Sequence, residues 1–162
     1  MSNVTPFRRP PPRPVRPQQE GGLGFKTHRG KAVLVQLLTV AAFLLNFLPY
    51  VLNFLAIGGV PRIALELPGM VAGIAGALVA VTNRGQGMPW AATHHEHALR
   101  TLIIGWSIWI LGSLLSYIHM ALGVGTIFVH LGVAIWAVVR ASIGLVLAAM
   151  RRPIQHPHGW LV

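Results

Sequence analysis

Cysteine is absent from the 162 residues, and carboxylates are almost absent: the chain contains only Glu20, Glu66 and Glu96. Without cysteine there is no disulfide, no thiolate nucleophile, no zinc–thiolate site and no iron–sulfur cluster. Three glutamates leave almost no source for a catalytic pair of carboxylates, and no set of nucleophile, base and orienting group is recognisable. We therefore expect a protein that is not an enzyme and that holds no cofactor.

Charged residues are also scarce, at 10% of the chain, whereas soluble domains contain about a quarter. Hydrophobic residues make up 54%, and the mean hydropathy is +0.62. Four apolar runs are long enough to cross the ~30 Å hydrocarbon core of a bilayer as helices. They cover residues 32–57, 65–82, 99–118 and 122–142. These runs predict an all-α integral membrane protein, with four transmembrane helices in a bundle within residues 32–150.

The lysines and arginines give a formal net charge of +10 and lie mostly outside the apolar runs. Residues 1–31 form a basic, proline-rich tail, which we expect to be disordered or extended because proline lacks the N–H that helices and sheets use. Residues 151–162 form a second basic tail. Since lysine and arginine are enriched in cytoplasmic loops, both termini are predicted to be cytoplasmic.

The stretch THHEHALRT, residues 93–101, precedes and enters the third run. Thr93 and Glu96 have the spacing of a capping box, so we expect a helix to begin at Thr93. As an alternative, His94 and His97 share a helix face and could both bind a metal. A metal would need a further ligand from the other cytoplasmic histidines, His28, His156 and His158. A third alternative is contact of this stretch with lipid phosphates or a partner.

Arg140 is a charged residue inside the fourth apolar run. We expect the span to end near Ser142, so that Arg140 reaches the interface and residues 144–150 lie along the membrane surface. The alternative is a span that continues to Met150, which would place Arg140 about 15 Å below the surface. In both cases an ion pair between Glu96 and Arg140 is predicted.

Three other patterns lie within the runs. Small residues at helical spacing, from Gly69 to Ala80, predict close helix packing inside the bundle, or in a homodimer. Asn46 and Asn53 share a helix face and predict interhelical hydrogen bonds, although polar faces also line pores. His119 and His130 are predicted to be interfacial or hydrogen-bonded, with a haem or a proton gate as the alternative.

The octapeptide HHEHALRT resembles the H-x-x-x-x-x-R-T signature of small four-helix bacterial membrane proteins of unknown function, which are grouped with the Tic-twenty-like proteins. His94, Arg100 and Thr101 match this signature. The fourth run and the tail also resemble the family in Arg140, Gly144, Arg152-Pro153 and the ending HPHGWL. The chain departs from the family pattern at Ile143, where a basic residue is frequent, and at Met150 and Arg151, where an acidic residue is common.

The resemblance covers residues 33–161 and implies a multi-pass protein of the bacterial cytoplasmic (inner) membrane. It implies no reaction. With Glu96 added to the matched positions, the residues expected to matter for function are His94, Glu96, Arg100, Thr101, Arg140 and Gly144.

The function expected from these observations is that of a non-catalytic interaction or assembly component. Its expected partners are anionic lipid headgroups, a protein bound through the N-terminal tail, and a second copy of the chain. Nucleic acid is not expected, because the tail lacks interleaved aromatic residues. One alternative is an oligomeric channel or transporter lined by Asn46, Asn53, Glu66 and Arg140. Another is a haem or metal carrier that uses His119, His130 or the histidines near His94.

Overall fold

The computed structural model describes residues 27–55, 61–85, 88–118 and 120–160. Within these ranges the secondary structure consists of four helices: α1 (His28–Phe54), α2 (Arg62–Asn83), α3 (Pro89–Ser116) and α4 (Met120–Ala149). Each helix is long and apolar enough to cross a membrane, which confirms the all-α, four-span prediction. The predicted conformation of the proline-rich tail concerns residues that lie outside the described ranges, apart from 27–31.

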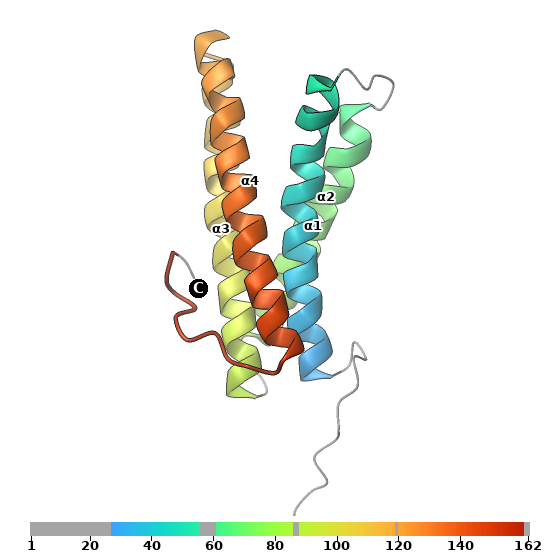
Figure 1. Cartoon of the computed structure of the whole chain (residues 1–162), viewed down its shortest axis with the longest axis vertical. Helices are drawn as coiled ribbons and strands as arrows, with labels where there is room; N and C mark the ends of the chain where they lie inside the picture. The colour runs from blue at the N-terminus through green and yellow to red at the C-terminus, as the bar shows by residue number, and fades with distance from the viewer. Residues whose placement is uncertain (1–26, 56–60, 86–87, 119, 161–162) are drawn as a thin grey trace, which may run out of the picture.

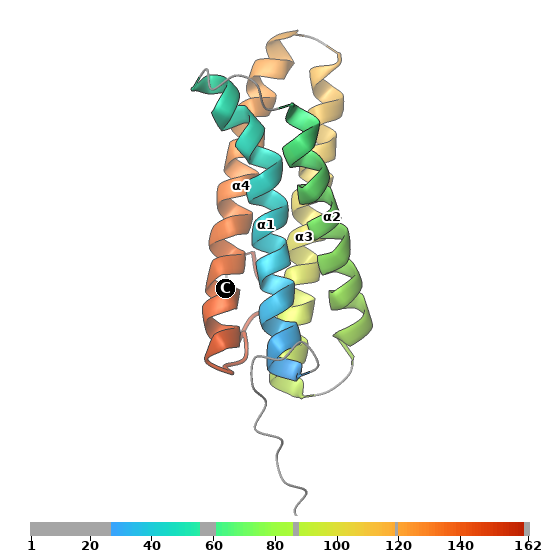
Figure 2. The same cartoon turned by 90° about the vertical axis from the view of Figure 1, so that its right-hand side faces the viewer.

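The helices form an up-and-down bundle (Figures 1 and 2). α1 packs along α2 and α4, α3 packs along α4, and α2 also contacts α3. Arg29 Nη2 donates a hydrogen bond to Ala149 O at 2.8 Å, and Lys31 Nζ donates to Asn83 Oδ1 at 2.8 Å. The start of α1 therefore lies beside the ends of α2 and α4. We call this the basic end of the bundle, because Arg29, Lys31, Arg84, Arg151 and Arg152 gather there, and the opposite end the far end.

α3 begins earlier than expected, at Pro89, with Met88 as its N-cap residue. Proline is well suited to the first turn, where its missing N–H costs nothing. Thr93 lies inside the helix, and its hydroxyl donates to Trp90 O at 2.7 Å. The prediction of a capping box at Thr93 is therefore wrong, because the polar residues that follow Pro89 continue a helix that has already started.

α4 does not end near Ser142 but continues to Ala149. It ends in a Schellman motif, in which Arg152 N donates to Leu147 O at 2.9 Å and Arg151 N donates to Ala148 O at 3.1 Å. Arg151 adopts the left-handed conformation that this motif requires, with φ of 56°. The prediction that residues 144–150 lie along the membrane surface is thus wrong, since nothing between Ser142 and Ala149 interrupts the helix.

The centre of the bundle is an apolar layer formed by Ala42, Phe43, Leu102, Val133 and Ala137. The small residues of α2 face this interior. A Cβ on Gly73 would lie 2.0 Å from the Trp106 ring, and one on Gly76 would lie 3.3 Å from Leu38. Gly69 in turn adjoins the Asn46 side chain. The small-residue pattern therefore serves packing within one chain, which was the first of its two predicted roles.

Candidate functional site

Five polar side chains are buried together between α1, α3 and α4, in the half of the bundle nearest the basic end. None is more than 3% exposed. They are Gln36, His94, His97, Thr101 and Arg140, which we call the polar cluster. Burial of this many polar groups in a membrane-spanning bundle is costly unless they bond to one another or to backbone.

Arg140 is at the centre of the polar cluster. Its Nε donates to Thr101 Oγ1 at 2.9 Å, and the Thr101 hydroxyl donates to His97 O at 2.8 Å. Its Nη2 donates to Pro157 O at 3.3 Å, and its guanidinium lies 5.7 Å from the centre of the Trp136 ring. Arg140 is therefore a buried residue that joins α3 and α4 and also binds the C-terminal segment.

The predicted ion pair between Glu96 and Arg140 is also wrong. Glu96 Oε1 accepts a hydrogen bond from Arg100 Nε at 2.7 Å, one turn along the same helix. His158 Nδ1 lies 3.7 Å from the same oxygen. Thr101 is five positions after Glu96, so the two side chains point in directions about 140° apart around α3. Since Thr101 faces Arg140, Glu96 faces away from it.

Gln36 links α1 to the polar cluster. Its Nε2 donates to His94 O at 3.2 Å and lies 3.4 Å from His97 Nδ1, which can accept from it. The carboxamide lies against Gly144 of α4, where a Cβ would be 2.7 Å from Gln36 Cδ. Gln36 was not among the residues predicted to matter, although a glutamine four residues inside an apolar run that later contains Thr39 and Asn46 indicates a polar helix face.

Residues 151–160, here called the C-terminal segment, turn back along α3 and α4 (Figure 1). Side chains of these two helices hold its backbone. His94 Nε2 donates to Arg152 O at 2.8 Å, and Thr93 Oγ1 accepts from Ile154 N at 3.0 Å. Farther along, Trp136 Nε1 donates to Trp160 O at 2.9 Å. With the bond from Arg140 to Pro157, four hydrogen bonds from the bundle therefore fix this segment.

Most of the residues that match the family signature lie close together, and each makes a different contact. His94 and Arg140 bind the C-terminal segment, Thr101 supports Arg140, and Gly144 makes room for Gln36. Arg100 and Glu96 form a pair that is partly exposed to the surroundings. The geometry holds a polypeptide segment in place.

The histidines of this stretch are deeply buried but do not form a ligand set. Among the described residues, no three histidine, aspartate or glutamate side chains converge as a metal ion requires. His94 already uses Nε2 to bind Arg152 O, and His97 Nδ1 faces Gln36. The described contacts leave Gln36 Oε1, His94 Nδ1, His95 Nδ1 and His97 Nε2 without a hydrogen bond.

A second group of polar residues lies toward the far end, beyond the apolar layer. His130 Nε2 donates to Trp109 O at 3.0 Å, and the His130 ring is stacked on the Trp109 ring at 4.1 Å. The hydroxyl oxygen of Tyr50 in α1 lies 3.3 Å from His130 Nδ1. His130 is thus hydrogen-bonded, as predicted, while His119, its suggested partner, lies outside the described residues.

The asparagines of α1 do not act as a pair. Asn46 Nδ2 donates to Ala42 O at 2.6 Å within its own helix, and Asn53 is exposed. The prediction that both make interhelical hydrogen bonds is therefore wrong for the contacts described. The layer around Phe43 also separates Asn46 from Arg140, so these two residues of the transport alternative do not share one path through a single chain.

No family model matches the chain, and neither a curated protein nor a solved structure matches it. What the molecule does must therefore follow from its own residues and their arrangement.

Proposed function

We propose that the protein is a non-catalytic multi-pass membrane protein that acts as an interaction or assembly component through its basic end. The observation that carries this proposal is the attachment of the C-terminal segment. Its backbone carbonyls accept three hydrogen bonds from side chains of the bundle, and its Ile154 N–H donates a fourth to Thr93. Most of its side chains remain exposed, among them Arg151, Arg152, Gln155, His156 and His158. Buried polar residues therefore support a fixed and chemically varied surface.

The charge at this surface suggests one class of partner. Arg151 and Arg152 are exposed at the same end as Arg29 and Lys31. Each basic residue near a membrane surface contributes about 1 kcal/mol of attraction to anionic headgroups. We infer that the basic end faces the cytoplasm, that both termini lie there, and that the membrane is the bacterial inner membrane, in keeping with the enrichment of lysine and arginine on that side.

Membership in the Tic-twenty-like family is part of the same proposal. It is supported by the positions of His94, Thr101 and Arg140, which match the family motif and meet in the polar cluster. A shared motif that anchors the C-terminal segment would explain why these residues occur together.

The proposal is tested by purifying the tagged full-length chain from its native membranes in a gentle detergent after mild crosslinking. Thr93→Val removes the acceptor for Ile154 N and should loosen the C-terminal segment. Thr82→Val is the matched control, because Thr82 is exposed and its hydroxyl bonds only within α2. Deletion of residues 1–19 tests the tail separately.

We expect a reproducible protein partner that is weakened by Thr93→Val or by the deletion and retained by Thr82→Val. A partner retained by every variant would show that the basic end is not the binding surface. Absence of any partner, combined with ion or solute flux into proteoliposomes that Arg140→Ala abolishes, would replace this proposal with the transport alternative.

A further inference from the structure

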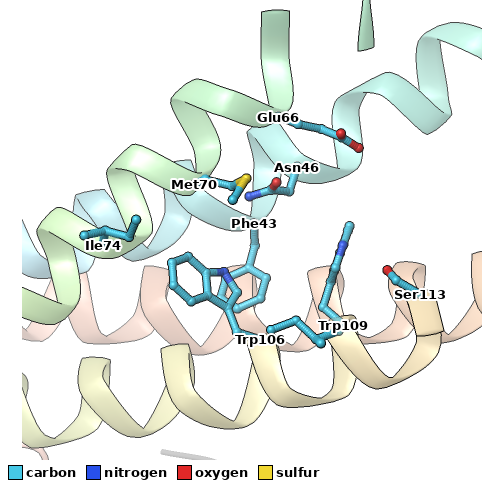
Figure 3. Close-up of a pocket in the computed structure, with 9 residues that line it drawn as sticks. Phe43, Asn46, Glu66, Met70, Ile74, Trp106, Trp109 and Ser113 are labelled. Carbon is cyan, nitrogen blue, oxygen red and sulfur yellow. The ribbon is translucent and has the colours of Figure 1, made fainter. Parts of the chain in front are cut away.

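A cavity of about 320 Å³ lies between α1, α2 and α3, on the far-end side of the apolar layer (Figure 3). Phe43 closes its inner side, and Trp106 and Trp109 project into it from α3. Its volume is at the lower end of the range for small-molecule sites, and its wall is mostly apolar and aromatic, as in such sites. It is separate from the polar cluster and the C-terminal segment.

The cavity borders the lipid-facing surface. Met70, Ile74 and Ile110 line it and are each about half exposed, at 49%, 50% and 57%. In a membrane-spanning bundle such exposed apolar side chains face acyl chains. An occupant would therefore enter from the bilayer and would need a hydrocarbon portion.

The wall of the cavity also carries polar groups that a purely hydrocarbon occupant would leave without hydrogen bonds. No described residue accepts a hydrogen bond from Trp106 Nε1–H or Trp109 Nε1–H, although both indoles line the cavity. The Ser113 hydroxyl on the same wall also has no described partner, and Asn46 uses only its Nδ2, which leaves Oδ1 as an acceptor. Donors and acceptors that border hydrocarbon are stabilised by a ligand that pairs with them.

The two indoles are held in fixed positions. Trp109 is stacked on His130, with 1° between the ring planes, and His130 bonds to the Trp109 backbone. Trp106 lies over Gly73, where no side chain larger than hydrogen fits. Donors fixed in advance bind a ligand without the loss of side-chain freedom that binding otherwise entails.

We propose that this cavity binds an uncharged membrane amphiphile that bears a hydroxyl group, such as a long-chain alcohol or a lipid with a free hydroxyl. The hydroxyl accepts from Trp109 Nε1–H and donates to Asn46 Oδ1, while the hydrocarbon chain leaves between Met70, Ile74 and Ile110. The Glu66 carboxylate, which also lines the cavity, disfavours a phosphate headgroup. This site is independent of the function proposed for the basic end.

The test uses photolabelling of the full-length protein in proteoliposomes with diazirine probes of equal chain length. The probes carry a hydroxyl, a methyl, an amine or a phosphate at the end of the chain, and the labelled residues are mapped by mass spectrometry. We expect saturable labelling of α2 and α3 around the cavity, stronger by about fivefold for the alcohol than for the alkane, as one hydrogen bond would produce.

Two variants link the label to the cavity. Ile74→Trp should fill it and reduce alcohol labelling by about fivefold. Leu78→Trp, one turn away and also exposed, should leave labelling unchanged. Trp109→Phe keeps an aromatic ring against His130 but removes the N–H, so it should lower alcohol labelling to the alkane level. Trp90→Phe, on the first turn of α3 and outside the cavity, is its control.

Equal labelling by the alcohol and the alkane would overturn the proposal, as would labelling that neither Ile74→Trp nor Trp109→Phe reduces. A preference for the amine would mean that Glu66 selects a cation instead. Labelling displaced by a second copy of the chain at higher protein density would mean that a helix occupies the site. If Ile74→Trp does not fold, as judged by its helical circular dichroism, Trp109→Phe alone decides.

Discussion

The Gln36 carboxamide lies flat enough against Gly144 that a Cβ on Gly144 would be 2.7 Å from Gln36 Cδ and 2.8 Å from both Gln36 Oε1 and Gln36 Nε2. Both residues are buried, on α1 and α4 respectively. A glycine near the C-terminal end of α4 is thus what allows a polar side chain of α1 to reach His94 O. The place of Gln36 in the polar cluster therefore depends on the absence of a side chain at residue 144.

Replacing Gly144 with alanine should therefore destabilise the bundle by about 1–3 kcal/mol, the usual effect of an added methyl group in a tightly packed site. Gly132→Ala in the same helix is the matched control, because a Cβ on Gly132 would have nothing within 4 Å. That change should be neutral or raise stability by up to about 1 kcal/mol, since alanine favours the helix. Thermal midpoints in one detergent measure both, and equal midpoints would contradict the contact.

Much of the fold follows from hydropathy, because lipid requires helical backbone wherever an apolar run is long enough to cross it. The helix ends are less predictable. The polar residues from Thr93 to Glu96 lowered the hydropathy ahead of Leu99, yet they are helical, and Thr93 and His94 bond to the C-terminal segment. Hydropathy treats a buried, hydrogen-bonded histidine as if it were exposed.

His94, Thr101 and Arg140 of the polar cluster were among the residues singled out from the sequence, but Gln36 and the contacts were not. Helical spacing alone pairs Glu96 with Arg100, one turn apart, and the prediction of a pair with Arg140 overlooked this local partner. The position of the C-terminal segment could not be predicted, because the bundle binds its backbone oxygens, which every residue type carries. These are the oxygens of Arg152, Pro157 and Trp160. Such contacts leave no signature in the sequence.

Thr101→Val tests the bond from Arg140 to α3. Valine keeps the shape of threonine but removes the acceptor for Arg140 Nε, and a buried donor that loses its partner costs about 1–3 kcal/mol. We expect a lower thermal midpoint, together with faster trypsin cleavage after Arg151 because Arg140 also holds Pro157. Thr82→Val, at an exposed position, should change the stability by less than about 0.5 kcal/mol. Similar effects of the two substitutions would argue against a structural role for Thr101.

A double-mutant cycle separates the observed ion pair from the one expected from the sequence. Glu96→Gln combined with Arg100→Gln should show a coupling energy of about 0.3–0.5 kcal/mol, because the Arg100 side chain is 43% exposed and exposed pairs on a helix are weak. Glu96→Gln combined with Arg140→Gln should be additive within about 0.3–0.5 kcal/mol. A larger coupling for the second pair than for the first would restore the contact between Glu96 and Arg140. Unfolding free energies in mixed micelles supply the values.

Arg151 tests the way in which α4 ends and the C-terminal segment begins. Its φ of 56° lies in the left-handed region, which costs about 1 kcal/mol or more for a residue with a Cβ and nothing for glycine. Arg151→Gly removes both this strain and the side chain, whereas Arg151→Ala removes the side chain but keeps the strain. The glycine variant should therefore be about 1 kcal/mol more stable than the alanine variant.

The same comparison at Arg152 is the control, because Arg151 alone has a positive φ among the described non-glycine residues. There the order should reverse, with glycine no more stable than alanine, since it only adds freedom to the unfolded chain. If glycine and alanine are equally stable at residue 151, the left-handed turn does not form in the membrane. The C-terminal segment would then leave α4 in another direction, and His94 could not reach the carbonyl of Arg152.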